Sequence, residues 1–96
     1  MKIQDLFQGI EILDSNIPEG TEVSAVKYSS RQVEPGDLFV AIVGYETDGH
    51  KYIPDAISRG AGVILCEKEM PEGTPWIRVA STRLALAQLG DRKSVV

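Results

Sequence analysis

Two short polar segments carry most of the side chains that could do chemistry in this chain of 96 residues. Ser30 and Arg31 follow a predicted strand that ends at Tyr28, and residues 44–50, which include Tyr45, follow another apolar run. In open α/β sheets, ligands bind beyond the carboxyl ends of strands, where loop hydroxyls and backbone N–H groups converge. We therefore expect the segments to meet there, with the Ser30 hydroxyl on a diphosphate or ribose and Tyr28 or Tyr45 against a flat base.

The same residues also fit purely structural roles. Residues 29–30 are typical of an ST-turn, Arg31 of a surface ion pair and Tyr28 of the core. Asp48 suits the N-terminus of a helix better than the role of a base, and His50 suits a local hydrogen bond in the first turn. The spacing of these residues alone leaves both interpretations open.

Residue counts exclude other kinds of site. One histidine and one cysteine cannot make a zinc site of the usual ligand number, although carboxylates could in principle assist them. The sequence has neither a G-x-x-x-x-G-K-[ST] phosphate loop nor a G-x-G-x-x-G motif, and nothing marks a nucleophile elbow. Cys66 ends the apolar run 63–66, where a thiol behaves as a small buried hydrophobe. We assign no catalytic residue and no metal ligand.

The composition is typical of one small domain, with 43% hydrophobic and 25% charged residues. A net charge of −4 provides no electrostatic footprint for nucleic acid. No apolar stretch approaches the roughly 20 residues that span a bilayer, and the N-terminus lacks the apolar region of a signal peptide. The single cysteine fits a reducing compartment. We expect a cytoplasmic protein without nucleic-acid or membrane partners.

Hydrophobic periodicity predicts the elements that position the two polar segments. An apolar stripe from Ile3 to Ile10 predicts a short helix. The predicted strands are 10–13, 22–28, 38–43, 63–67 and 76–80. The further predicted helices are 51–59 and one that begins at Ser81 or Thr82. Residues 14–21 are expected to form a loop, and residues 34–37 a turn in which Asp37 is a turn residue.

The order of these elements indicates the fold class. Strand, helix and strand across residues 38–67 are typical of a right-handed crossover between parallel strands. Pro54 falls in the first turn of the intervening helix, and Gly60 stands where a C-terminal cap is expected. We predict an α/β fold with a small mixed, partly parallel sheet flanked by helices.

A longer pattern joins the two polar segments. Residues 28–42 read YSSRQVEPGDLFVAI, and Gly44, T-D-G-H at 47–50, Y-I at 52–53, A-I at 56–57 and R-G-A at 59–61 follow. Over roughly residues 1–90, this sequence resembles the N-terminal domain of the Mur ligases, the ATP-dependent amino-acid ligases of bacterial peptidoglycan synthesis. Residues 91–96 do not match the family pattern and are interpreted as a tail.

The resemblance implies a role in substrate binding. In this family the first domain holds the uridine diphosphate end of the substrate, here UDP-N-acetylmuramoyl-dipeptide. A central domain binds ATP and Mg²⁺, and a C-terminal domain brings the incoming amino acid. The positions that match the family's uridine diphosphate contacts are Tyr28, Ser30, Arg31, Tyr45, Glu46 and Thr47.

The sequence departs from the family at two points. Ser29 stands where the family usually has an Asp, which weakens a local cap or turn contact but leaves the Ser30 hydroxyl. The F-Y-x-x-P segment and the G-T-N-G-K-T phosphate loop do not occur. We therefore expect no cofactor in this chain, partner domains elsewhere in a longer parent, and neither ligase activity nor ATP hydrolysis from these residues alone.

Three functions fit the resemblance. The pattern is most similar to members that add the third peptide residue, diaminopimelate or lysine, to UDP-N-acetylmuramoyl-L-alanyl-D-glutamate. Members that add D-alanyl-D-alanine share much of the same pattern. A non-catalytic module that binds a nucleotide sugar or a protein partner is the alternative from another class.

Overall fold

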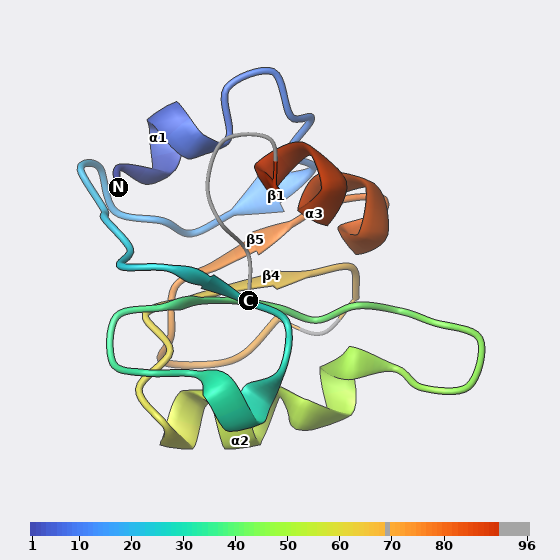
Figure 1. Cartoon of the computed structure of the whole chain (residues 1–96). Helices are drawn as coiled ribbons and strands as arrows, with labels where there is room; N and C mark the ends of the chain where they lie inside the picture. Colours follow the sequence, from blue (N-terminus) through green and yellow to red (C-terminus); the bar gives the residue numbers. More distant parts are fainter. Residues whose placement is uncertain (69, 91–96) are drawn as a thin grey trace.

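The structure is a computed structural model that describes residues 1–68 and 70–90. A five-stranded sheet forms its centre, in the order β1-β5-β4-β3-β2 (Figure 1). The strands are β1 (Asp14–Ser15), β2 (Val26–Lys27), β3 (Leu38–Val40), β4 (Val63–Cys66) and β5 (Trp76–Arg78). Strands β2 to β5 run parallel, and β1 pairs antiparallel with β5. The predicted α/β fold with a mixed, partly parallel sheet is confirmed.

Helices cover both faces of this sheet (Figure 1). The helices are α1 (Ile3–Leu6), α2 (Ile53–Ser58) and α3 (Thr82–Gly90), with the 3-10 helices η1 (Ser30–Gln32) and η2 (Gly49–Tyr52). Helices α1 and α3 lie on one face, and η1 and α2 lie on the other. The fold therefore has three layers, and the polar segment 28–31 belongs to the layer of α2.

Alternation along the strands divides the core in two. Leu38 and Val40 of β3 face α1 and α3, whereas Phe39 between them faces α2. Val26 of β2 likewise packs on the first face. Because successive side chains of a strand point to opposite faces, Lys27 is turned toward the layer of η1 and α2. Every residue of the central strands β3 and β4 is buried, as expected for strands covered on both faces.

The predicted strand 10–13 is wrong, and part of the predicted loop 14–21 is a strand. Ile10 is buried in the core under α1, whereas Ile12 and Leu13 are 39% and 45% exposed. The edge strand β1 begins directly after Leu13, where Asp14 and Ser15 align with Arg78 and Ile77. Its register is set by the partner strand β5 and not by any apolar alternation of its own.

The other elements are shorter than predicted. Of the predicted strand 22–28, only the two residues of β2 form a regular strand. The predicted helix 51–59 is reduced to the six residues of α2, and its first two positions belong to η2. Pro54 does lie at its start, and Gly60 follows it with φ +99°. A Cβ atom on Gly60 would lie 2.9 Å from Pro35 Cα, so the position requires glycine.

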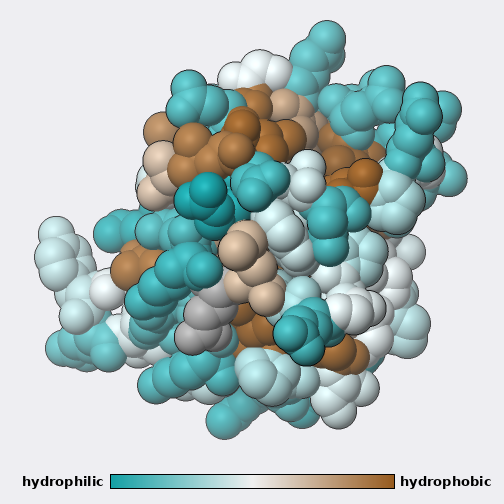
Figure 2. Space-filling view, turned by 180° about the vertical axis from the view of Figure 1, so that it is seen from behind, coloured by the Kyte–Doolittle hydropathy of each residue, from teal (hydrophilic) through white to brown (hydrophobic). Residues whose placement is uncertain are grey.

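The back of the molecule carries several exposed apolar residues (Figure 2). Figure 2 shows apolar residues on the back of the molecule as separate patches divided by hydrophilic side chains. The large hydrophobic residues that are exposed are Ile12, Leu13, Tyr28, Tyr45, Tyr52, Met70 and Leu84. Within residues 1–68 and 70–90, no helix has the length and apolar character needed to cross a bilayer. The predicted tail 91–96 lies outside the described residues.

Candidate functional site

A buried ion pair holds the segment that follows β2. Lys27 Nζ lies 2.7 Å from Asp37 Oδ2, and the two side chains are 10% and 2% exposed. The same ammonium donates a hydrogen bond of 3.2 Å to the carbonyl oxygen of Gln32, the last residue of η1. Asp37 also accepts from the backbone N–H of Glu34 at 2.9 Å. Asp37 is a turn residue, as predicted, and its carboxylate also ties the turn to Lys27 of β2, which in turn binds η1.

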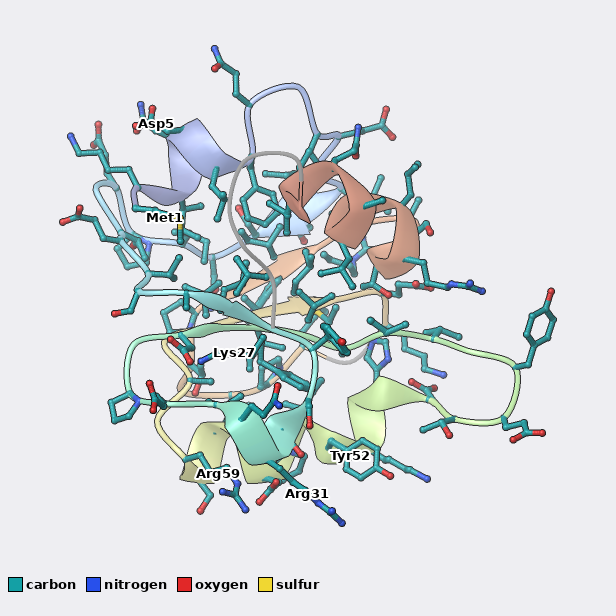
Figure 3. All side chains as sticks on the ribbon, viewed as in Figure 1. Met1, Asp5, Lys27, Arg31, Tyr52 and Arg59 are labelled. Atoms are coloured by element: carbon teal, nitrogen blue, oxygen red, sulfur yellow. The ribbon has the colours of Figure 1, made fainter. Side chains whose placement is uncertain are left out.

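This anchored segment opens into a pocket of about 290 Å³. The lining residues are Tyr28, Ser29, Ser30, Arg31 and Tyr52. Tyr28 is 51% exposed, so its predicted alternative place in the core is wrong. Figure 3 shows Arg31, Tyr52 and Arg59 on one side of the molecule, away from Met1 and Asp5. The pocket thus combines a hydroxyl, a guanidinium and two exposed aromatic rings.

Asp55 of α2 and Arg59, the residue that ends this helix, lie beside η1. The Ser30 hydroxyl hydrogen-bonds to the Asp55 carboxylate, and this bond, together with the Arg59 guanidinium, holds the pKa of Asp55 below its usual range. Arg59 Nε lies 3.2 Å from Asp55 Oδ2, and its Nη1 donates to the Arg31 carbonyl oxygen at 3.5 Å. Arg31 and Arg59 together outweigh Asp55, so the local charge suits an anionic ligand.

Tyr52 is the pocket residue that the sequence interpretation did not include. It ends η2, immediately before α2, and reaches the pocket because α2 packs beside η1 on the same face of the sheet. In the sequence it lies 22 positions after Ser30, and no local pattern joins the two. Its only signal was its place in the longer pattern shared with the Mur ligases.

The second polar segment does not reach this pocket. Tyr45, Glu46 and Thr47 are exposed, Tyr45 completely, and none of them lines it. The segment closes on itself, because Val43 and Asp48 form a β-bridge and the Gly44 N–H donates to the Thr47 carbonyl oxygen at 2.8 Å. Figure 1 shows this loop reaching outward, beyond η1 and α2. The two segments leave the same edge of the sheet but do not meet.

His50 sits at the centre of a buried network beside that loop. The ring is 1% exposed, and its Nε2 accepts hydrogen bonds from the backbone N–H groups of Glu67 at 2.8 Å and Lys68 at 3.3 Å. Since Nε2 is an acceptor, Nδ1 carries the proton and donates to Asp48 Oδ1 at 2.6 Å. The predicted local hydrogen bond of His50 is confirmed by the contact with Asp48, and the ring also joins η2 to the end of β4.

The same network continues into α3. Glu67 Oε2 accepts from the backbone N–H and the hydroxyl of Thr82, each at 2.8 Å. The Ser81 hydroxyl accepts from the Leu84 N–H at 3.2 Å, which confirms Ser81 as a cap of this helix. The start of α3 is thereby fixed to the carboxyl end of β4.

Asp48 is confirmed as an N-terminal cap, since it accepts from the His50 N–H at 2.9 Å. Its ion pair with Lys68, and then the His50 N–H, hold the pKa of the Asp48 carboxyl well below its usual range. A carboxyl with a depressed pKa in the folded state stabilises the fold above its unfolded pKa of about 4. This contribution is lost as the pH falls toward the folded-state value.

Asn can still cap the helix, so we expect Asp48→Asn to lower the free energy of unfolding at pH 7 by about 1 kcal/mol, the difference between hydrogen bonds to a charged and to a neutral acceptor. The carboxylate is 34% exposed, so solvent limits what the ion pair adds. The difference from the original protein should shrink as the pH is lowered below about 4. Urea unfolding at several pH values measures it, with the exposed Asp5→Asn as control. A difference independent of pH would contradict the assignment.

No metal centre can be built from the described residues. Within residues 1–68 and 70–90, no three His, Cys, Asp or Glu side chains converge in a group that could hold an ion. Cys66 is buried, as predicted, and its thiol donates to the Ile77 carbonyl oxygen at 3.5 Å. The side chains that line the pocket offer hydroxyl groups, a guanidinium and aromatic rings.

Sequence relatives share most of this chain. A diaminopimelate ligase from Alkaliphilus metalliredigens, "UDP-N-acetylmuramoyl-L-alanyl-D-glutamate--2,6-diaminopimelate ligase", is 39% identical over 93 residues, which are 95% of this chain and 19% of that protein. A Roseiflexus protein, "UDP-N-acetylmuramyl-tripeptide synthetase", is 47% identical over 75% of this chain and 15% of its own length. The chain thus spans about a fifth or less of the curated relatives it matches.

Solved structures share the fold. A D-alanyl-D-alanyl ligase from Acinetobacter baumannii superposes with a TM-score of 0.81 and 33% identity, over 93% of this chain and 20% of that one. A ligase from Thermotoga maritima, solved with ADP, gives a TM-score of 0.63 and 31% identity, over 73% of this chain and 16% of that one. The family described as "Mur ligase family, catalytic domain" matches residues 22–94. With the sequence, the fold and the family pattern in agreement, this chain belongs to the Mur ligase family.

Proposed function

We propose that this chain binds the uridine diphosphate end of a peptidoglycan precursor within a longer ligase. The observation that carries the proposal is the pocket after β2, where Ser30, Arg31 and two tyrosines converge. A hydroxyl and a guanidinium suit the oxygens of a diphosphate, and an aromatic ring suits the face of a base. The whole substrate would be UDP-N-acetylmuramoyl-dipeptide.

In this proposal the chain contributes orientation to the reaction. Binding energy gained at the uridine end, far from the reacting carboxylate, fixes the rest of the substrate where other domains act on it. The sequence holds no phosphate loop, and the residues described here do not form a metal centre. We therefore assign no ATP or Mg²⁺ step to these residues and place both in the partner domains of the parent.

Tyr45, Glu46 and Thr47 remain proposed contacts to the same ligand. Their side chains are exposed on a loop that leaves the carboxyl edge of the sheet, next to the strand that precedes the pocket. Contact with a ligand held by Ser30 requires this loop to move toward η1 or the ligand to extend along the edge. Tyr45→Ala tests this contribution separately from the pocket.

Third-residue addition is the reaction we propose for the parent. The curated relatives at 36–40% identity over more than nine-tenths of this chain carry the diaminopimelate ligase name. Addition of D-alanyl-D-alanine is the second candidate, favoured by the TM-score of 0.81 to the Acinetobacter ligase. Two ligation assays with the full-length parent separate the candidates. A third-residue ligase joins diaminopimelate or lysine to the dipeptide substrate, whereas the second candidate joins D-alanyl-D-alanine to the tripeptide substrate.

Binding is tested by titrating the isotope-labelled chain with UDP in an NMR experiment. We expect shifts of the amides of Ser30 and Arg31, and an affinity reduced about five- to tenfold by Arg31→Ala, since a charge-assisted hydrogen bond is lost. Ser30→Ala should weaken binding by about fivefold. Arg83→Ala, an exposed arginine on α3, is the matched control. UDP that moves no amide of the pocket would refute the proposal.

A further inference from the structure

Two aromatic side chains of the pocket are exposed without a role in the core. Tyr28 is 51% exposed and Tyr52 is 42% exposed, and both line the pocket beside Ser30 and Arg31. Neither belongs to the two apolar clusters that build the core. A tyrosine ring left in water at a polar pocket offers a flat apolar surface that a planar ligand group can cover.

A cation holds one face of the Tyr52 ring. Lys51 Nζ lies 5.1 Å from the ring centroid, within the range of a cation–π contact. This contact restricts the ring, which is 42% exposed and lines the pocket. The ammonium also adds positive charge next to a pocket that already contains Arg31.

The backbone that carries Tyr52 is firmly anchored. His50, two positions before it, is 1% exposed, and Ile53 directly after it is 4% exposed in the core between α2 and the sheet. Tyr45, by contrast, is completely exposed within the exposed segment 44–47. A ring on a fixed backbone loses less conformational freedom on binding than a ring on an exposed loop.

We propose that Tyr52 stacks on the nucleobase and forms, with Tyr28, the base-binding wall of the pocket, while Ser30 and Arg31 hold the phosphates. The inference rests on the proposed function, because it assumes a uridine ligand in this pocket. It assigns to Tyr52 the stacking role that the sequence had suggested for Tyr28 or Tyr45. Tyr52 is then a determinant of the preference for a base over a bare diphosphate.

The test follows the base of UDP directly. Stacking moves the uracil H5 and H6 resonances upfield, and we expect this shift with the original chain and with Tyr52→Phe. Tyr52→Ala should abolish most of it and weaken UDP binding about tenfold, the usual effect of removing an aromatic platform. Leu84→Ala, which removes an exposed apolar side chain on α3, is the control and should change neither quantity.

The outcomes separate this inference from the proposed function. If UDP moves the Ser30 and Arg31 amides but Tyr52→Ala keeps both the uracil shift and the affinity, Tyr52 does not bind the base and the inference is overturned. If Tyr52→Phe loses as much affinity as Tyr52→Ala, the hydroxyl and not the ring face is responsible, and stacking is again overturned. If UDP moves no pocket amide of the original chain, the proposed function itself fails.

Discussion

Replacing Lys27 by Met is expected to lower the free energy of unfolding by about 3–5 kcal/mol, the cost of leaving one partner of a buried ion pair alone. The Asp37 carboxylate, which is 2% exposed, would lose the ammonium that lies 2.7 Å from its Oδ2 atom. The carbonyl oxygen of Gln32 would also lose its donor. Equilibrium urea unfolding measures the loss, and Lys2→Met, at an exposed lysine, should change it little.

A second variant distinguishes the ion pair from simple packing. Lys27→Met combined with Asp37→Leu removes both charges, and we expect it to recover part of the lost stability. The Glu34 N–H still loses its acceptor, so recovery stays incomplete. A single Lys27→Met variant as stable as the original protein would contradict the anchoring role. Because Lys27 holds the last residue of η1, the folded fraction of this variant should also bind UDP more weakly.

Replacing His50 by Ala is expected to cost about 3–5 kcal/mol, from the cavity together with a buried N–H that loses its acceptor. The ring is 1% exposed, and the Glu67 N–H donates to it at 2.8 Å. Glu67 in turn binds the first residue of α3. We therefore expect faster hydrogen exchange at the Glu67 amide and at the start of α3, besides the lower unfolding free energy.

Two conservative variants show which nitrogen matters. Gln at position 50 can place an acceptor near the position of Nε2, whereas Asn can reach only the position of Nδ1. Since Nε2 serves two backbone donors and Nδ1 serves Asp48 alone, His50→Gln should be more stable than His50→Asn. The reverse order would mean that the contact with Asp48 dominates the network.

The central strands, and the pocket residues Ser30 and Arg31, could be predicted from the sequence. Apolar runs around Phe39 and Ile64 report directly on burial from both faces, so β3 and β4 followed from composition and turn signals. Ser30 and Arg31 followed from their place after a strand and from the family pattern. In these cases the information is local to the residues concerned.

The features that were missed depend on partners far along the chain. Strand β1 is made of two polar residues, and only its pairing with β5 makes it a strand. Tyr52 reaches the pocket because α2 packs beside η1, and His50 finds its donor 17 positions away at Glu67. Hydrophobic periodicity carries no information on such contacts, since tertiary packing overrides local preference.

The two outermost strands of the sheet, β1 and β2, are each two residues long. An edge strand presents unpaired N–H and C=O groups, and long exposed edges are templates for pairing with another chain. Here the longer strands β3, β4 and β5 all lie inside, so little free backbone is offered at either side. The short edge strands therefore protect the sheet against edge-to-edge aggregation.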